Sequence, residues 1–193
     1  REMARRDDTK MLGLRGLYVE AQRRNDTDNA RLFAEEAAKV SPSLPWASQA
    51  ALDYRTAAAG WAGAVVALDA MRPALDKADF RRQRAVLLTA RAMALETADR
   101  DAARAMALEA VKLAPWLVPA AVLAGRLPAE AGSVRKAGRI LDTAWLAAPH
   151  PDIATTYANL RYGDSARERR NRVQRLADKK PNHIESALAL AQA

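Results

Sequence analysis

The sequence has no cysteine, and only 8 of its 193 residues are glycine and 2 are phenylalanine. Without thiols the chain cannot form a disulfide, a zinc knuckle, an iron–sulfur site or a cysteine nucleophile. Alanine, leucine and arginine dominate instead, and these three residues favour helices over strands. The composition therefore predicts an all-α protein.

Long uncharged segments are missing as well. The two longest, residues 56–68 and 113–125, have 13 residues each, whereas a membrane-spanning helix needs about 20. No signal peptide is visible at the N-terminus. Because the chain begins at Arg1 and its last helical pattern stops at Ala193, we interpret it as a soluble piece of a longer protein.

An internal repeat with a period of 34 residues runs through the sequence. Residues 26–42 and 99–115 share nine of seventeen positions, including the final proline. A third copy places its small residues and its proline another 34 residues on, at Ala137, Ala144 and Pro149. A fourth, weaker copy has Ala64, Leu68 and Met71 in the corresponding positions. Such self-similarity predicts stacked supersecondary units.

The repeat resembles the tetratricopeptide repeat, a helix–turn–helix unit in which small residues lie where two helices cross and a proline ends the unit. Those roles fall to Ala30, Ala37 and Pro42 in the first copy. Small side chains let helix backbones approach closely, and proline interrupts the helix before the next pair. The resemblance implies a right-handed superhelix, an α-solenoid of about five helix pairs plus a terminal helix, in a single domain 1–193.

The expected repeats are 8–42, 45–76, 79–115, 117–149 and 150–181, with a terminal helix at 183–193. The expected helices are 8–24, 27–40, 45–59, 61–72, 79–97, 99–113, 117–131, 133–147, 151–161 and 164–179, before the terminal one. Pro128 falls inside one of them and should kink or shorten it, because proline lacks the backbone N–H that a helix interior uses. We interpret the terminal helix as a cap or as the first helix of another repeat.

Several phrases also resemble the C-terminal region of HemY-type proteins from bacterial haem-biosynthesis operons. They are 14–18 (LRGLY), 34–38 (AEEAA), 44–46 (LPW), 58–61 (AAGW), 81–88 (RRQRAVLL) and 164–166 (DSA). The resemblance implies a parent anchored in the bacterial inner membrane by N-terminal helices absent here. It places the repeat domain outside the bilayer, with the cytoplasmic face favoured, and supplies no catalytic residues.

The residues that usually carry chemistry are sparse, so the sequence predicts no enzyme, no metal site and no cofactor. The two histidines, His150 and His183, lie in different repeats without a neighbouring ligand set. We expect both to be surface or capping residues, and the alternative is axial ligation of haem iron. The chain has no glycine-rich phosphate loop and no nucleophile elbow.

In tetratricopeptide arrays the first helix of each pair lines the concave groove. Transferred to this sequence, that register predicts a partner-binding groove formed by Arg15, Val19, Gln22, Arg23, Trp46, Gln49, Asp53, Leu88, Glu96, Val122 and Arg126. The mixture suits a peptide held by a few polar anchors over an apolar floor. The carboxylate clamp known from this family is not supported, because its first two positions are occupied here by Arg15 and Val19.

Basic clusters form a second candidate surface on a chain of net charge +8. They comprise Arg81, Arg82 and Arg84 near one helix start, and Arg167, Arg170, Arg172 and Arg175 along another helix. These arginines are either a solvated outer face or a surface for anionic lipid headgroups. Nucleic acid is disfavoured because no aromatic residues are interleaved with the charges.

Three functions are compatible with the sequence. The sequence favours a scaffold for protein–protein interactions, with other proteins or peptides as partners and enzymes of haem synthesis among them. The alternative is a carrier of haem or a porphyrin that uses the groove, with arginines pairing the propionates. A hydrolase or transferase has no supporting motif.

Overall fold

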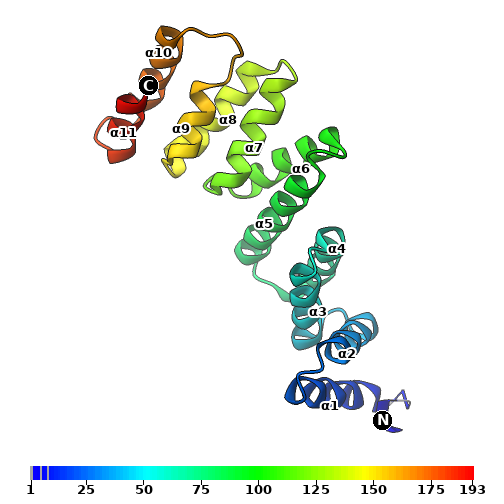
Figure 1. The fold of residues 1–193 in the computed structure, drawn as a ribbon. Helices are drawn as coiled ribbons and strands as arrows, with labels where there is room; N and C mark the ends of the chain where they lie inside the picture. Colours follow the sequence, from blue (N-terminus) through cyan, green and yellow to red (C-terminus); the bar gives the residue numbers. More distant parts are fainter. Residues whose placement is uncertain (1, 5, 8) are drawn as a thin grey trace. The chain divides into compact units, whose positions relative to one another are not determined.

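The computed structural model describes residues 2–4, 6–7 and 9–193, and all the regular structure in these residues is helical (Figure 1). The chain divides into two compact units, residues 1–83 and 84–193, with one helix, α5, running across the boundary. The α-helices are α1 (Lys10–Arg23), α2 (Thr27–Val40), α3 (Pro45–Ala57), α4 (Trp61–Met71), α5 (Lys77–Leu95), α6 (Arg100–Leu113), α7 (Val118–Glu130), α8 (Val134–Ala147), α9 (Pro151–Ala158), α10 (Ala166–Ala177) and α11 (Ile184–Gln192). Two short 3-10 turns, η1 (Glu2–Ala4) and η2 (Arg72–Ala74), accompany them.

The predicted all-α class and the succession of helix pairs are confirmed. Every expected helix is present. The expected start at residue 8 lies outside the described residues, and the other ends lie within three residues of the predicted ones. In the first unit, α1 packs on α2, α2 on α3 and α3 on α4. In the second, α6 packs on α7, α7 and α8 pack on each other and on α9, and α10 and α11 complete the stack against α9. The single domain 1–193 stays a prediction.

The repeated small residues form the contacts between helices, as the period of 34 predicts. Twelve equivalent positions are at most 3% exposed: Ala30, Ala34, Ala37, Ala64, Leu68, Met71, Ala103, Ala107, Ala110, Ala137, Leu141 and Ala144. Helices α2, α6 and α8 also end alike, because the backbone N–H of Ser41, Ala114 and Ala148 each donates to the carbonyl four residues earlier. The recurrence of alanine or a larger apolar residue at these positions therefore reflects a repeated packing geometry.

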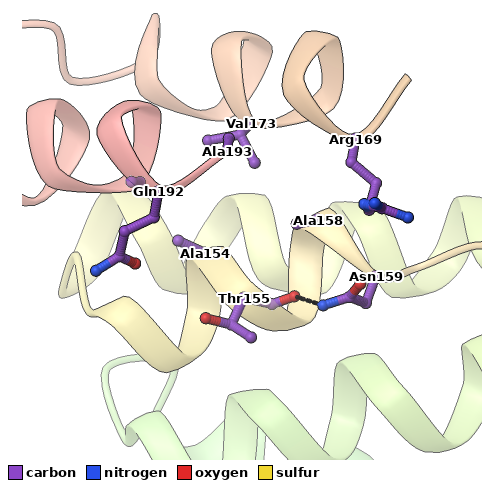
Figure 2. Close-up of a pocket in the computed structure, with 9 residues that line it drawn as sticks. Ala154, Thr155, Ala158, Asn159, Arg169, Val173, Gln192 and Ala193 are labelled. Atoms are coloured by element: carbon purple, nitrogen blue, oxygen red, sulfur yellow. Dashed lines mark hydrogen bonds between the residues drawn. The ribbon is translucent and has the colours of Figure 1, made fainter. Parts of the chain in front are cut away.

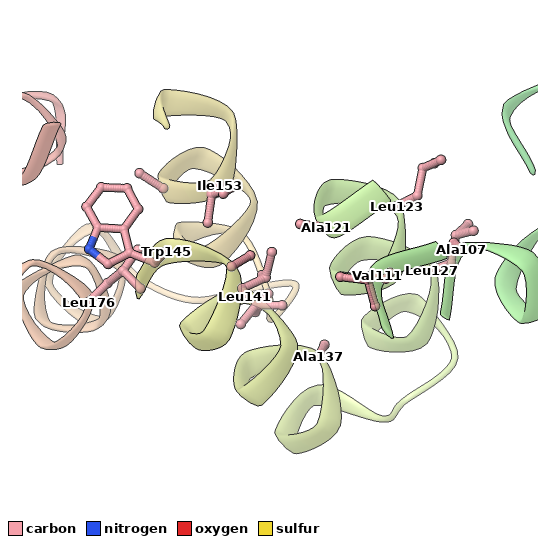
Figure 3. Packing of buried hydrophobic residues seen from close by; sticks show 14 of the residues in the cluster. Ala107, Val111, Ala121, Leu123, Leu127, Ala137, Leu141, Trp145, Ile153 and Leu176 are labelled. Atoms are coloured by element: carbon pink, nitrogen blue, oxygen red, sulfur yellow. The ribbon is translucent and has the colours of Figure 1, made fainter. Parts of the chain in front are cut away.

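The larger core lies in the second unit. Trp145 from α8, Ile153 from α9 and Leu176 from α10 are fully buried together with Leu141 (Figure 3). This cluster holds α9 and α10 against the preceding pair. Complete burial of large apolar side chains is the main source of stability in such a stack.

Helix α7 is not shortened by Pro128. The helix continues to Glu130, two residues beyond the proline and one short of the predicted end. Pro128 lies in the last turn, where its carbonyl accepts a hydrogen bond from the backbone N–H of Ser133 (2.8 Å). Proline has no N–H to donate to the carbonyl of Ala124 one turn earlier, so α7 lacks that one intrahelical bond and still continues to Glu130.

Candidate functional site

In the first unit, side chains from α1 and α3 meet on one face. We call the set Arg15, Tyr18, Gln22, Trp46, Gln49, Asp53 and Tyr54 the α1/α3 face. The rings of Tyr18 and Trp46 lie 5.4 Å apart between centroids and are tilted by 38°. The Arg15 guanidinium carbon lies 6.0 Å from the centroid of the Trp46 ring, within the range of a cation–π contact.

Hydrogen bonds fix the polar members of this face. The Gln22 amide donates to the Tyr18 hydroxyl (2.7 Å), and the Gln49 amide donates to the Asp53 carboxylate (2.8 Å). Burial raises the pKa of Tyr18, and the neighbouring Tyr54 and Asp53 raise it further. The Tyr18 hydroxyl therefore stays protonated and keeps its donor hydrogen well above neutral pH.

The α1/α3 face combines accessible polar groups with a half-buried aromatic centre. Its polar residues Arg15, Gln22, Gln49 and Asp53 are exposed, and Tyr18 and Tyr54 are half-buried. Two further predicted residues, Val19 and Arg23, are exposed on α1. The sequence-based groove omitted both tyrosines, although Tyr18 lies three residues after Arg15 and four before Gln22, which places it on the same helix stripe.

In the second unit, the predicted groove residues Glu96 and Arg126 bind each other. The two guanidinium nitrogens of Arg126 donate to the two carboxylate oxygens of Glu96 at 2.7 and 2.8 Å. Glu130 lies 3.5 Å from Arg126 and also pairs with Arg100. A bidentate pair of this kind fixes the orientation of the guanidinium plane, so Arg126 is held by the protein itself.

A pocket of about 470 Å³ lies between α7 and α9, and we call it the α7/α9 pocket. Its lining residues are Arg126, Ala129, Glu130, Thr155, Thr156, Asn159, Leu160 and Tyr162. Of the remaining predicted groove residues, Val122 is half-buried on α7. Leu88 requires a correction: it is only 3% exposed, because its side of α5 faces the interior, and it cannot line an open groove.

The charge pair makes stability depend on pH. The hydrogen bond from Arg126, aided by the positive charges of Arg126 and Arg100, lowers the pKa of Glu96. Because this pKa is lower in the folded chain than its usual value of about 4.3 in the unfolded one, the pair contributes stability above pH 4.3. That contribution is lost as the pH falls through the folded-state pKa.

We therefore expect Glu96→Gln to destabilise the chain above about pH 5, by an amount that shrinks as the pH falls towards 3. The side chains of Glu96 and Arg126 are 27% and 37% exposed, so solvent screening limits the difference to about 0.5–1 kcal/mol. Urea unfolding of both proteins between pH 3 and 7 measures it. A difference that persists unchanged to pH 3 would contradict this assignment.

The predicted basic residues differ in exposure, and the exposed Arg82 also pairs with Asp79 (3.4 Å). Arg81 and Arg82 are exposed on the first half of α5, and Arg167, Arg170 and Arg175 are exposed on α10. Arg84 instead bonds Glu109 of α6 at 3.0 Å.

Arg172 is the second correction, because it is buried rather than on the surface. It bonds Asp164 and donates to the carbonyl of Ala158 (2.8 Å). Its guanidinium therefore binds within the chain and is not available to an anionic surface.

A smaller pocket of about 260 Å³ lies among α9, α10 and α11 (Figure 2). Arg169, Asn159 and Gln192 supply its polar groups, and Val173 and several alanines supply its apolar wall. The Asn159 amide donates to the carbonyl of Thr155 (2.9 Å), and so provides a donor for a carbonyl in the last turn of α9. The small size of this pocket and its mixture of polar and apolar residues are typical of the groove between packed helices.

Both histidines cap helices, as predicted. Nδ1 of His150 accepts from the N–H of Asp152 (3.2 Å) at the start of α9, and Nδ1 of His183 accepts from that of Glu185 (3.1 Å) at the start of α11. Among the residues with described positions, no group of three or more His, Asp or Glu side chains could hold a metal ion. In that same part of the chain, no helix has the length and apolarity needed to cross a bilayer.

Comparisons with known proteins give structural likeness only. No family model matches the chain, and none of the curated proteins compared with it matches. It is similar to the crystal structure of YrrB, a TPR protein with an unusual peptide-binding site, at 17% identity and a TM-score of 0.48, over 89% of this chain and 87% of that one. It is also similar to TTC0263, a thermophilic TPR protein of Thermus thermophilus, at 18% identity and a TM-score of 0.40, over 94% and 97% of the two chains.

Proposed function

We propose that this chain is a non-enzymatic scaffold that binds other proteins or peptides, with the α1/α3 face as its main contact surface. The observation that carries the proposal is the meeting of Arg15, Tyr18 and Trp46 from two helices. Tryptophan, tyrosine and arginine are the residues that most often dominate binding energy in protein interfaces. Tyr18 and Trp46 are half-buried and packed against each other, with the exposed Arg15 beside Trp46. This packing lowers the conformational entropy that these side chains lose when a partner binds.

The polar groups around this centre support a peptide ligand. Gln49, Gln22 and Asp53 are exposed and offer donors and acceptors at helical spacing along two neighbouring helices. Such an arrangement can pair with a partner's backbone or polar side chains while the aromatic rings pack against its apolar ones. The surface therefore suits an extended or helical segment with at least one apolar anchor.

The finer proposal depends on the resemblance to HemY-type proteins. On that basis we propose a membrane-anchored parent associated with haem biosynthesis, with client enzymes from that process. The alternative of a haem or porphyrin carrier receives less support. Arg126, the arginine at the larger pocket, already binds Glu96 through both guanidinium nitrogens, and a propionate would have to displace that carboxylate.

The test is photo-crosslinking from a reactive amino acid at Gln49, followed by binding measurements with the purified client. We expect Trp46→Ala to weaken client binding at least tenfold, because it removes the aromatic centre of the face. Trp116→Ala is the matched control, since Trp116 is an exposed tryptophan outside the α1/α3 face. Unchanged binding by Trp46→Ala, or adducts obtained from Arg170 but not from Gln49, would contradict the proposal.

A further inference from the structure

The outer face of α11 carries an exposed apolar stripe. Ile184 is 70% exposed and Leu188 47% exposed, and Ala187 and Ala191 are exposed as well. These four residues follow the spacing i, i+3, i+4, i+7, which places them on one side of a helix. The opposite side contains the buried Ser186 and Ala189, and there α11 packs on α9 and α10.

The order of residues in the stripe is self-complementary. Consider two such helices that run antiparallel and cross midway between residues 187 and 188. Each residue then faces the residue at the same distance on the other side of that midpoint. Ile184 then faces Ala191 of the other helix, and Leu188 faces Ala187. Every large side chain meets a small one, which is the arrangement that lets side chains of two helices interlock without voids. A parallel pair would instead place large against large and leave gaps between the alanines.

We propose that α11 pairs antiparallel with α11 of a second copy of this chain and forms a two-fold symmetric dimer. An isologous interface of this kind requires a surface that complements itself, and the stripe meets that requirement. The helix also has only one charged residue, Glu185. Pairing two copies therefore places no like charges within the stripe.

The flanking charges set the salt dependence of this dimer. Residues 161–180, directly before α11, include eight Lys or Arg and three Asp or Glu. Two copies that meet through α11 bring these positive segments nearer to each other, so added salt should strengthen the dimer by screening their repulsion. Since each copy contributes a helix of only nine residues, the interface belongs to the small, weak class of protein contacts.

The first test is analytical ultracentrifugation of the 193-residue chain between about 5 and 500 µM, at low and high salt. We expect Leu188→Glu to weaken dimerisation at least tenfold, because a carboxylate would be buried against Ala187. The matched control is Leu146→Glu on α8, since Leu146 is 51% exposed and outside the stripe. A wild-type chain that stays monomeric throughout, or a dimer that Leu188→Glu leaves intact, overturns the proposal.

The second test determines the register, and the absence of native cysteine makes it clean. Within one helix, residues 184 and 191 are about 10 Å apart, too far for an internal disulfide. We expect the double variant Ile184→Cys/Ala191→Cys to oxidise to a covalent dimer, and Ile184→Cys alone to stay largely uncrosslinked. The control pair is Arg167→Cys/Gln174→Cys, with the same spacing on the exposed face of α10. Equal crosslinking by the control pair, or efficient crosslinking by Ile184→Cys alone, overturns the antiparallel arrangement.

Discussion

Replacing Arg172 by alanine is expected to lower the free energy of unfolding by about 3–5 kcal/mol. The side chains of Arg172 and Asp164 are only 9% and 8% exposed, and they form an ion pair. Arg172 also donates to the carbonyl of Ala158 at the end of α9. Its removal leaves the buried Asp164 carboxylate and the Ala158 carbonyl without this donor, and an unpaired buried polar group destabilises the folded state. Because the bond to the Ala158 carbonyl joins α10 to α9 and the ion pair joins α10 to the loop between them, the loss should loosen the C-terminal helices first.

Urea unfolding measures this loss, and Arg170→Ala on the same helix is the control. Arg170 is exposed, so its replacement should change the free energy of unfolding by less than about 0.5 kcal/mol. The double variant Arg172→Met/Asp164→Leu should recover most of the stability, since it removes both buried charges together. Equal effects of Arg172→Ala and Arg170→Ala would show that the ion pair is solvated in solution.

Sequence patterns predicted the helices well because the repeat is encoded by local features. Asp26 and Asp99 cap α2 and α6 through their carboxylates, and the alanines that recur every 34 residues are buried at the crossings. A cap requires only its own side chain and the backbone three residues on. These features can be recognised along the chain without knowing which helices are neighbours.

The side-chain partners could not be predicted in the same way. Arg172 appeared equivalent to Arg167 and Arg170 in a basic segment, yet it lies beside the buried Val173 and Leu176 and bonds the loop before its own helix. Leu88 and Glu96 were both assigned to a groove by register, but one faces the core and the other binds Arg126. Whether a side chain faces the core or a neighbouring helix depends on how each helix is rotated about its axis. Residue spacing alone does not determine that rotation.

The α1/α3 face shows how far a transferred register can succeed. Arg15, Trp46 and Gln49 were assigned to one surface because they belong to the first helices of successive pairs, and Arg15 and Trp46 do lie together. The two tyrosines of the face, Tyr18 and Tyr54, were not among the predicted groove residues, and both are half-buried. A half-buried aromatic residue can serve both roles, with one edge in the core and the other at the surface.

Leu141→Ala is expected to cost about 2–5 kcal/mol, and adding Gly125→Ala should restore part of that loss. Leu141 of α8 is fully buried against Gly125 of α7, and a Cβ atom at Gly125 would lie 2.7 Å from its Cγ and Cδ2 atoms. In the wild-type chain, Gly125→Ala therefore overpacks the crossing and should cost about 1–2 kcal/mol, although alanine favours helix more than glycine does. Once Leu141 is truncated, the same methyl group fills part of the cavity.

The sign reversal of Gly125→Ala is the decisive result, and a double-mutant cycle by urea unfolding measures it. Gly138→Ala in α8 is the control, because a Cβ atom there would meet its nearest neighbour, Leu160, at an ordinary distance of 3.8 Å. We expect that variant to stabilise both the wild-type chain and Leu141→Ala by about 0.5–1 kcal/mol, which is the helix preference of alanine alone. If Gly125→Ala behaves like Gly138→Ala in the wild-type background, α7 and α8 have room to separate, and the small residues of the repeat do not set the distance between the paired helices.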